Sequence, residues 1–548
     1  EISECLVGSE MCIRDRDYSR QLGDHYFKVM GGFNAEHQNV RTLSAQRDGI
    51  IVPDLPTIDT STEQDVAGGG YNHWATAGFF GRLNYNYKEK YLLEVNGRYD
   101  GTSRFMKDQR WNFFPSFSLG WNVARENFWK PLESVVNQFK LRGSWGELGN
   151  QNTSNLYPFY EILPVKSNSG NWLVNGGKTN TADIPSLVST LLTWERVRSF
   201  NVGFDFGAFS NRLTGSFDYF VRKTVDMVGP APQLPLVLGI APAIVNNADM
   251  KSYGFEIELS WRDRIGEVDY GVKFNLADAQ QKVVKYPNTT NAFSDWYAGK
   301  MSGEIWGYTS LGIAKTDEEM KEHLASLPNG GQNQLGNKWG AGDIMYADIN
   351  GDGKIDGGKG TLADPGDQRI IGNSTPRYNF GLVLDASYKG FDVSIFFQGV
   401  GKRDYAPIVG TNGAVFWGAV NNIWQSMAME EHFDYFRPEG HPMGANLNGY
   451  YPRPDFTSNK NHQVQTRYLQ DASYIRLKNL QIGYTLPKQW INKLHINRCR
   501  VYVSGDNLWT GTSLASMFDP ETLAAGDWGS GKTYPLSKVI SFGLNVNF

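Results

Sequence analysis

Alternation of apolar and polar residues with a period of two runs through most of the chain and constrains its fold more than any other feature. In residues 391–398, Phe391, Val393, Ile395 and Phe397 fall on one face of an extended strand, and mostly polar residues fall on the other. The pattern recurs in residues 80–101, 200–223, 253–278, 379–390, 474–487 and 500–510. The chain is therefore expected to be all-β, with strands that have two unlike faces.

The connections between these strands alternate between short and long. Tight polar turns at 87–91, 209–212 and 388–391 predict antiparallel hairpins. The opposite strand ends open into long polar segments: 34–73, 150–192, 229–250, 285–376, 404–473 and 511–536. About fourteen strands with every long loop on one side are typical of an antiparallel transmembrane β-barrel. Loop lengths vary too widely for the fixed repeat of a propeller or solenoid.

Composition agrees with a barrel and excludes other classes. The 548 residues include 60 Gly, 31 Phe, 27 Tyr and 16 Trp, but only 20% are charged, with a formal net charge of −4. The sequence has no block of Lys and Arg residues that would form a phosphate-binding surface, so nucleic acid is not expected as a partner. No run approaches eighteen apolar residues and the mean hydropathy is −0.43, which excludes membrane-spanning helices. This criterion does not exclude barrel strands, because the hydropathy of their lipid-facing and water-facing residues averages out along each strand.

The chain ends on an amphipathic strand, residues 539–548. Phe542, Leu544, Val546 and Phe548 share one face, and the alternation of connections places this end on the short-turn side. Similarity to bacterial outer-membrane barrels implies that the terminal Phe548 is also an assembly signal.

From about Tyr18 to Phe548 the sequence resembles the barrel of SusC/RagA-type TonB-dependent outer-membrane transporters of Bacteroidota. The resemblance rests on the order and spacing of residues 78–105, 111–128, 139–152, 192–206, 342–356, 472–487 and 501–510. It implies the C-terminal part of a twenty-two-stranded, multi-pass barrel in the outer membrane, with the plug, TonB box and signal peptide upstream of residue 1. It also implies import of oligosaccharides or peptides, a SusD-like surface lipoprotein, the TonB complex and lipid as partners, and no enzymatic activity.

The first sixteen residues, EISECLVGSEMCIRDR, precede this pattern. They resemble a translated sequencing-library adapter, and we interpret residues 1–16 as non-native and 17–548 as the barrel segment. On this interpretation Cys5 and Cys12 carry no redox meaning, and Cys499 remains alone as a small packing residue.

Residues 348–356 match most of a calcium-binding loop. Asp348, Asn350, Asp352 and Asp356 stand at positions 1, 3, 5 and 9 of an EF-hand-like loop, with Lys354 at position 7 and Gly353 at the turn. Position 12 is Lys359 rather than an acid, and Asp364 or Asp367 are candidate replacements. We predict a structural Ca²⁺ that braces a loop; the alternative is a polar turn without metal.

Six tryptophans in the long loops are candidates for stacking on sugar rings. They are Trp172, Trp296, Trp306, Trp417, Trp424 and Trp528. For each of them the alternative is packing between loops or a place in the interfacial aromatic girdle.

The remaining motifs do not indicate an enzymatic activity. Gly526–Thr533 satisfies the GxxxxGK[ST] pattern, but Pro535 follows at once and no strand–helix context surrounds it, so nucleotide binding is not expected. No HExxH occurs, and Asp205, Asp218 and Glu256 lie within strands, where we expect solvated positions facing the lumen.

Two other functions remain open from the sequence. A passive outer-membrane porin would have the same wall, and a soluble glycan-binding or glycan-cleaving β protein would be polar on both outer faces.

Overall fold

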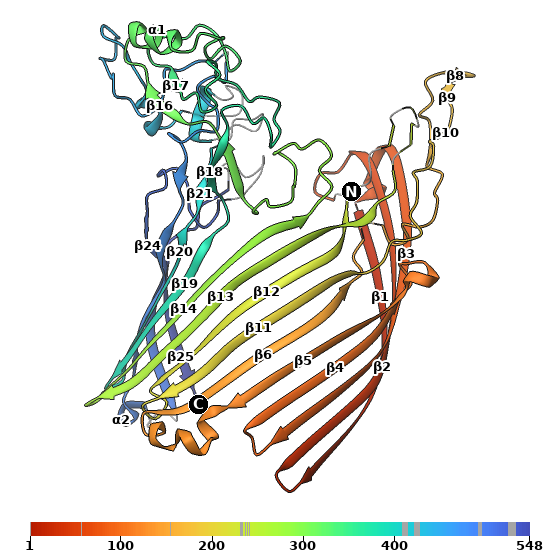
Figure 1. The fold of residues 1–548 in the computed structure, drawn as a ribbon, viewed down its shortest axis with the longest axis vertical. Coiled ribbons are helices and arrows are strands. Elements are labelled where there is room, and N and C mark those ends of the chain that lie inside the picture. Colours follow the sequence, from red (N-terminus) through yellow and green to blue (C-terminus); the bar gives the residue numbers. More distant parts are fainter. Residues whose placement is uncertain are drawn as a thin grey trace.

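The computed structural model consists of one large curved antiparallel sheet with irregular loops gathered at one end (Figure 1). It describes residues 2–55, 57–153, 155–230, 234–235, 237, 239–240, 242–407, 415–420, 428–456, 458–491, 496–523 and 533–548. Within these residues no helix has the length and apolar character to cross a bilayer.

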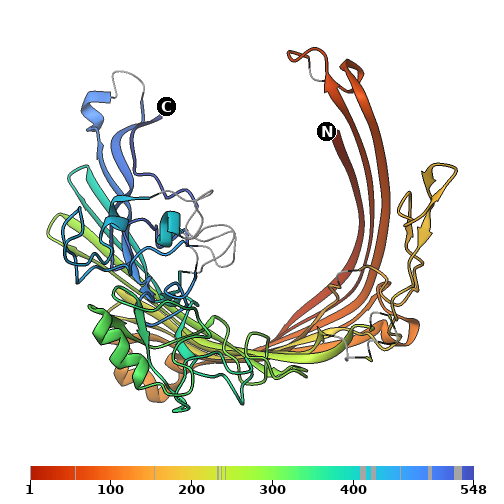
Figure 2. The same cartoon turned by 90° about the horizontal axis from the view of Figure 1, so that it is seen from above.

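Fifteen strands of the described chain form the sheet, each hydrogen-bonded to its neighbours in sequence order. They are β1 (Ile2–Leu22), β2 (His25–Ile50), β3 (Ser61–Tyr87), β4 (Tyr91–Thr102), β5 (Trp111–Asn122), β6 (Val136–Asn150), β11 (Glu195–Ala208), β12 (Leu213–Gly229), β13 (Val245–Ile265), β14 (Val268–Lys285), β19 (Arg377–Tyr388), β20 (Phe391–Lys402), β23 (Tyr474–Thr485), β24 (Arg498–Thr512) and β25 (Val539–Asn547). The sheet bends into an open wall with β1 and β25 at its two edges (Figure 2). The expected fold class is confirmed.

The remaining elements are short and lie in the connections. The strands are β7 (Val165–Lys166), β8 (Leu173–Val174), β9 (Gly177–Lys178), β10 (Thr181–Ala182), β15 (Glu304–Gly307), β16 (Ser310–Ile313), β17 (Ile344–Tyr346), β18 (Arg369–Asn373), β21 (Asp404–Tyr405) and β22 (Gln470–Asp471). The helices are α1 (Asp317–Ala325) and α2 (Lys488–Ile491), with 3₁₀ turns η1 (Ile58–Thr60), η2 (Lys107–Gln109), η3 (Val123–Arg125), η4 (Asn127–Leu132), η6 (Val415–Val420) and η7 (Glu430–Phe433).

Short and long connections alternate as expected. The large connections 286–376 and 403–473 lie at one end of the sheet, and hairpin turns such as 389–390 lie at the other, together with the C-terminus (Figure 1). The expected loop at 34–73 is wrong, because β2 and β3 continue through most of it and pair from His25↔Tyr87 to Ile50↔Ser61. Glycines 68–70 and polar neighbours hide the alternation there, while backbone pairing continues through the segment and the Tyr71 hydroxyl adds a hydrogen bond to Asn39 at 2.9 Å.

β1 pairs with β2 along its whole length and contains the residues interpreted as adapter-derived. Fourteen of the fifteen sheet strands thus lie wholly within residues 17–548. The interpretation of residues 1–16 stays a prediction.

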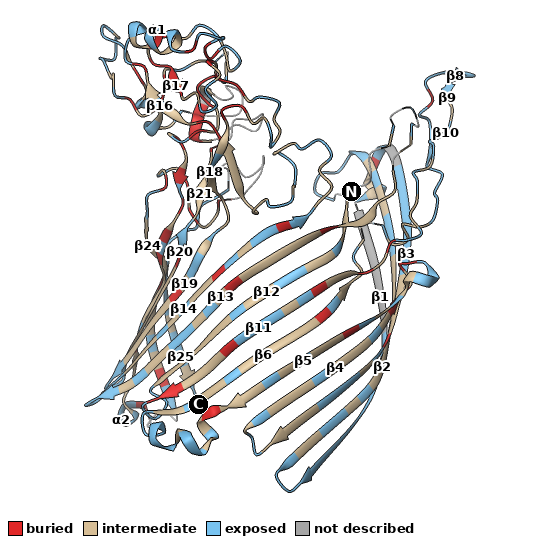
Figure 3. Cartoon of the chain, viewed as in Figure 1, coloured by how far each residue is buried: buried red, intermediate tan, exposed pale blue. Residues whose placement is uncertain are grey.

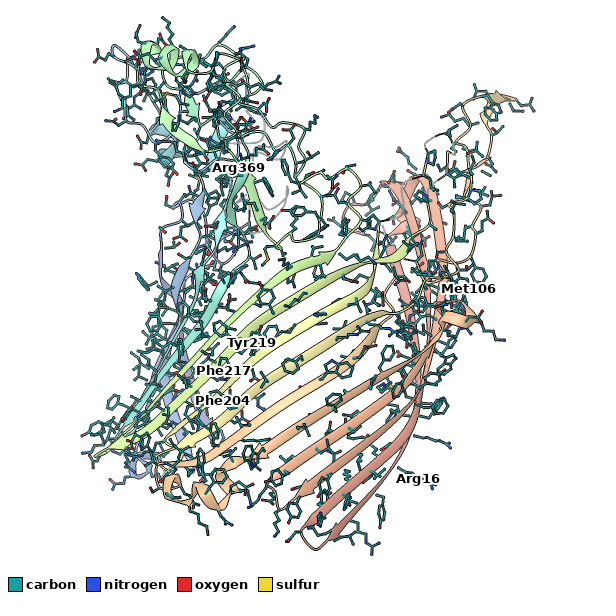
Figure 4. All side chains as sticks on the ribbon, in the orientation of Figure 1. Arg16, Met106, Phe204, Phe217, Tyr219 and Arg369 are labelled. Atoms are coloured by element: carbon teal, nitrogen blue, oxygen red, sulfur yellow. The ribbon has the colours of Figure 1, made fainter. Side chains whose placement is uncertain are left out.

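Register gives the wall one apolar and one polar face. Leu83, Val95, Phe117 and Trp145 stand opposite one another on β3 to β6. Phe117 is 46% exposed although it is surrounded by apolar neighbours. Phe204, Phe217 and Tyr219 belong to the same face on β11 and β12, which is the convex face (Figures 2 and 4). We call it the apolar face.

The concave side is lined by the alternate residues, and we call it the polar face. Asn84, Glu94, Ser118 and Ser144 stand in register across β3 to β6. The Asn84 amide donates to Glu94 Oε2 at 2.8 Å, so polar groups on this face pair with each other. Buried side chains gather mainly in the loops rather than in the wall (Figure 3).

The two-residue turn Lys389–Gly390 joins β19 to β20 with positive φ at both positions, 45° and 89°. This is the backbone of the hairpin turn that the sequence predicted. A Cβ on Gly390 would lie 2.8 Å from the Thr485 carbonyl oxygen, whereas one on Gly266, in the equivalent turn between β13 and β14, would meet open space.

We therefore expect Gly390→Ala to destabilise the sheet more than Gly266→Ala. Both substitutions force alanine into the left-handed region, at about 1 kcal/mol each, and only Gly390→Ala adds a steric overlap. Urea titration of both variants in detergent, followed by the heat-modifiable gel shift of β-barrels, measures the difference. Equal midpoints would contradict the role of the Thr485 contact.

Candidate functional site

Two regions could meet a solute: the polar face of the wall and the large loops above it. On the polar face, Arg142 of β6 reaches across two strands. Its guanidinium donates to Asp205 of β11, with Nη2 to Oδ1 at 3.1 Å, and to Asp218 of β12, with Nη2 to Oδ2 at 2.6 Å. Asp205 and Asp218 therefore share one cation rather than only facing solvent, while Glu256 of β13 is exposed.

Parts of the connections 286–376, 403–473 and 513–523 pack into one unit, which we call the loop body. Its core is aromatic and contains residues from all three connections. The buried members are Tyr308, Leu327, Ile344, Tyr346, Ile355, Phe416, Trp417, Tyr451, Tyr468, Ala472, Leu514, Phe518 and Leu523. Loops far apart in the sequence are thus held as a small folded domain at the end of the wall (Figures 1 and 3).

A buried carboxylate joins two of these connections. Asp343 is fully buried, and its oxygens accept hydrogen bonds from Arg453 Nη2 at 2.7 Å, Lys460 Nζ at 3.0 Å and Asn461 Nδ2 at 2.9 Å. The Gly340 amide donates to the same carboxylate at 2.9 Å. Two cations and two neutral donors satisfy this charge inside the loop body, as a buried ion requires.

A second ionic cluster fixes the third connection to the wall. Arg476 of β23 donates to Asp519 and Glu521, each at 2.7 Å, and Lys478 donates to Glu521 at 2.6 Å. The side chain of Arg476 is nearly inaccessible to solvent. Residues 513–523 are thereby tied to the polar side of the loop end.

The predicted calcium loop is closed by hydrogen bonds of its own. Asp348 accepts from the Gly351 and Gly353 amides at 2.6 and 2.8 Å. Asp367, rather than Asp364, crosses the loop, because its carboxylate accepts from the Ile349 and Asp356 amides at 2.8 and 2.9 Å. Of the two candidates for the last ligand, Asp367 is the one brought to the motif.

Lys354 supplies a positive charge within the same loop. Its ammonium lies 2.5 Å from Asp356 Oδ2 and 3.8 Å from Asp352 Oδ2, and this hydrogen bond lowers the pKa of Asp356. Among the described residues, no three His, Cys, Asp or Glu side chains are placed to hold a metal ion. A cation at this loop would have to displace the Lys354 ammonium.

The six candidate tryptophans are in different environments. Trp172 is 61% exposed and Trp296 is 39% exposed beside Lys300, at 5.8 Å from its Nζ. Trp306 stacks on Phe293, with ring centroids 4.5 Å apart, and Trp417 is buried in the loop-body core. Trp424 and Trp528 lie outside the described residues, as does most of Gly526–Thr533.

His462 is a residue that the sequence did not single out. It is 4% exposed, its ring lies 4.6 Å from that of Trp417, and its Nδ1 has no hydrogen-bond partner. Burial lowers the pKa of His462 to about 4, against a smaller opposing effect of Asp455. Only burial distinguishes it from other loop histidines, so no sequence signal could have found it.

Residues 13–508 match the family model described as TonB dependent receptor-like, beta-barrel. The chain is 28% identical to TonB-dependent receptor P3 of Formosa agariphila, over 97% of this chain and 51% of that protein. It is 24% identical to TonB-dependent receptor SusC of Bacteroides thetaiotaomicron, over 97% of this chain and 49% of that protein. The chain spans about half the length of these relatives.

Solved structures show the same fold. The structure of the RagAB peptide transporter superposes with a TM-score of 0.77 at 20% identity, over all of this chain and 56% of that one. The RagAB peptide importer in its open-open state gives a TM-score of 0.75, also at 20% identity and over all of this chain, but over 55% of that one.

The environment of His462 predicts that the loop body loosens in acid. Between pH 6.5 and 4 an unfolded loop binds a proton that the folded loop does not, so the free energy of unfolding falls as pH falls, by roughly 3 kcal/mol in total. Hydrogen exchange of peptides covering 458–472, corrected for the intrinsic rate, should rise at pH 5 relative to pH 7. His462→Gln should remove this dependence, and His441→Gln, in a partly exposed position of the same connection, should keep it.

Proposed function

Since the chain belongs to the TonB-dependent receptor-like β-barrel family, we propose that its sheet is part of the wall of a transporter that imports oligosaccharides or peptides across an outer membrane. The family match over residues 13–508 carries this proposal. The large loops would face the outside and capture the solute, and the energy would come from a TonB complex. The transport step needs no covalent chemistry, so the chain is not proposed to be an enzyme.

The unlike faces of the wall support a membrane position. Exposed aromatic and aliphatic side chains occupy the apolar face, as lipid contact requires. Tyr87, Tyr91 and Trp121 stack along the short-turn end, with centroid distances of 6.3 and 6.5 Å, and Phe128 packs edge-on against Trp121. Such a row is typical of an interfacial aromatic girdle. A soluble glycan-binding protein would not expose this face to water.

The loop body supports a capturing role. It is folded by its own core and buried ion pairs, so it can present a defined surface at the end of the wall. A SusD-like lipoprotein is the partner that we propose for this end. Trp172 and Trp296 are the exposed residues among the candidate tryptophans with described positions, and we propose them as contact residues.

Uptake in the bacterium that carries the gene tests the transport proposal. Deletion of the gene should abolish growth on one class of oligosaccharide or peptide and leave growth on its monomers unchanged. Uptake should also stop when the proton-motive force is collapsed, whereas a passive porin would continue to conduct. Growth unchanged on every oligosaccharide and peptide would contradict the proposal.

Two tryptophan variants refine this test. Trp172→Ala and Trp296→Ala should each weaken capture of a glycan by roughly 1–3 kcal/mol if an aromatic stack is lost, by analogy with stacking on other rings. Trp111→Ala, on the apolar face, is the matched control and should not change capture. A tagged protein should co-purify a SusD-like lipoprotein with all three variants.

We also propose that the 348–356 loop binds calcium weakly and structurally. Isothermal titration should show binding that Asp352→Ala removes, because it deletes an oxygen ligand. Lys354→Gln should strengthen binding, because the ammonium that competes for Asp356 is gone. Asp295→Ala, in the same connection but outside the motif, is the control. Identical titrations of wild type and Asp352→Ala would contradict the site.

A further inference from the structure

Four basic side chains stand side by side on the apolar face near its long-loop end. The antiparallel register places Arg198 of β11 opposite Lys223 of β12, Lys223 opposite Lys251 of β13, and Lys251 opposite Lys282 of β14. We call these residues the basic row. Neighbouring strands lie about 4.8 Å apart, so four cations lie within roughly 15 Å.

The aromatic and aliphatic side chains of the apolar face form a band across the strands, which we call the apolar band. The basic row lies directly at the edge of this band, on the side of the long loops. Phe200, Val221 and Tyr253 lie on the same face of β11, β12 and β13. Each is two positions closer to the short turns than the basic residue of its strand. Along β11, β12 and β13 the surface changes from aromatic and aliphatic to basic within about 7 Å, whereas on β14 the residue next to Lys282 on this face is Gln280. Lys251 Nζ lies 5.0 Å from the centroid of the Tyr253 ring and so marks this boundary.

The charges of the row are mostly uncompensated. Arg198 Nε donates to Glu147 at 2.8 Å at one end, but in the described part of the chain Lys223, Lys251 and Lys282 form no ion pair. Like charges directly opposite one another on a sheet repel and destabilise it. The two consecutive pairs Lys223–Lys251 and Lys251–Lys282 repel in this way. An anion from outside the chain would relieve this repulsion.

Several other basic residues of the wall are paired with acidic side chains of the chain. Nearer the short turns, Arg212 pairs with Asp263 at 3.0 Å and Lys389 pairs with Glu267 at 2.7 Å. On the apolar face itself, Asp278 is neutralised by Arg377. These three basic side chains, Arg212, Lys389 and Arg377, have counter-charges within the chain.

We propose that the basic row binds the phosphate groups of anionic lipid headgroups in the leaflet nearest the long loops. This inference rests on the proposed membrane position of the wall. Continuity with the apolar band places the ammonium groups at headgroup depth, and their charge is complementary to phosphate. Lysine side chains can extend along the band toward this level.

Lipid selectivity in vesicles tests the proposal. The chain is reconstituted in phosphatidylcholine vesicles, and the association of spin-labelled phosphatidylglycerol is compared with that of spin-labelled phosphatidylcholine by electron spin resonance. We expect the wild type to prefer phosphatidylglycerol by about fivefold or more at low salt and to lose this preference at high ionic strength. Replacing Lys223, Lys251 and Lys282 by Gln should abolish it.

The matched control changes the same number of charges on the other face. Lys140, Arg222 and Lys273 lie on β6, β12 and β14 and point to the polar side, and Arg222 is the neighbour of Lys223 in sequence. Replacing these three by Gln should leave the preference intact. Equal preference for the two lipids in the wild type, or equal loss in both triple variants, would overturn the inference.

Membrane insertion is measured separately in the same samples. Protection of the wall from added protease shows whether the chain inserts, which is what the proposed function requires. Insertion without lipid preference would remove the basic-row inference alone, whereas failure to insert in any lipid would remove the membrane position on which both depend.

Discussion

Pairing of the backbone between neighbouring strands is the constraint on which the rest of the structure depends. A segment surrounded by lipid has no water to satisfy its amides and carbonyls, so each strand must find them in its neighbours. The antiparallel order from β1 to β25 does this without a crossover. Once register is fixed, side chains alternate between two environments, and the apolar band, the polar face and the basic row all follow from the same pairings.

The sequence could predict the wall because the wall is periodic. Alternation in residues 391–398 and the turn at Lys389–Gly390 specify strands and hairpins locally, and both are confirmed. The segment 34–73 forms strands where the sequence predicts a loop, and the reason is physical. Strands that extend beyond the apolar part of the wall need no apolar face, so their pairing leaves no alternation in the sequence. The alternation of apolar and polar residues therefore indicates where a strand has one apolar and one polar environment, and it does not indicate where the strand ends.

The loop body could not be predicted in the same way. Asp343, Lys460 and His462 look like ordinary polar loop residues, and only contacts between distant connections make them a buried core. The calcium motif was visible as a spacing, but the ammonium of Lys354 beside Asp356 depends on side-chain placement. Likewise, four tryptophans with described positions range from exposed to buried although all lie in loops.

The buried Asp343 carboxylate, which joins two connections, limits how the sequences of these loops can change during evolution. Its carboxylate comes from the connection between β14 and β19, while Arg453, Lys460 and Asn461 come from the connection between β20 and β23. Transfer of either connection alone into a related barrel would leave buried charges without counter-charges. The two segments therefore form one heritable module, and recombination that preserves folding must exchange them together.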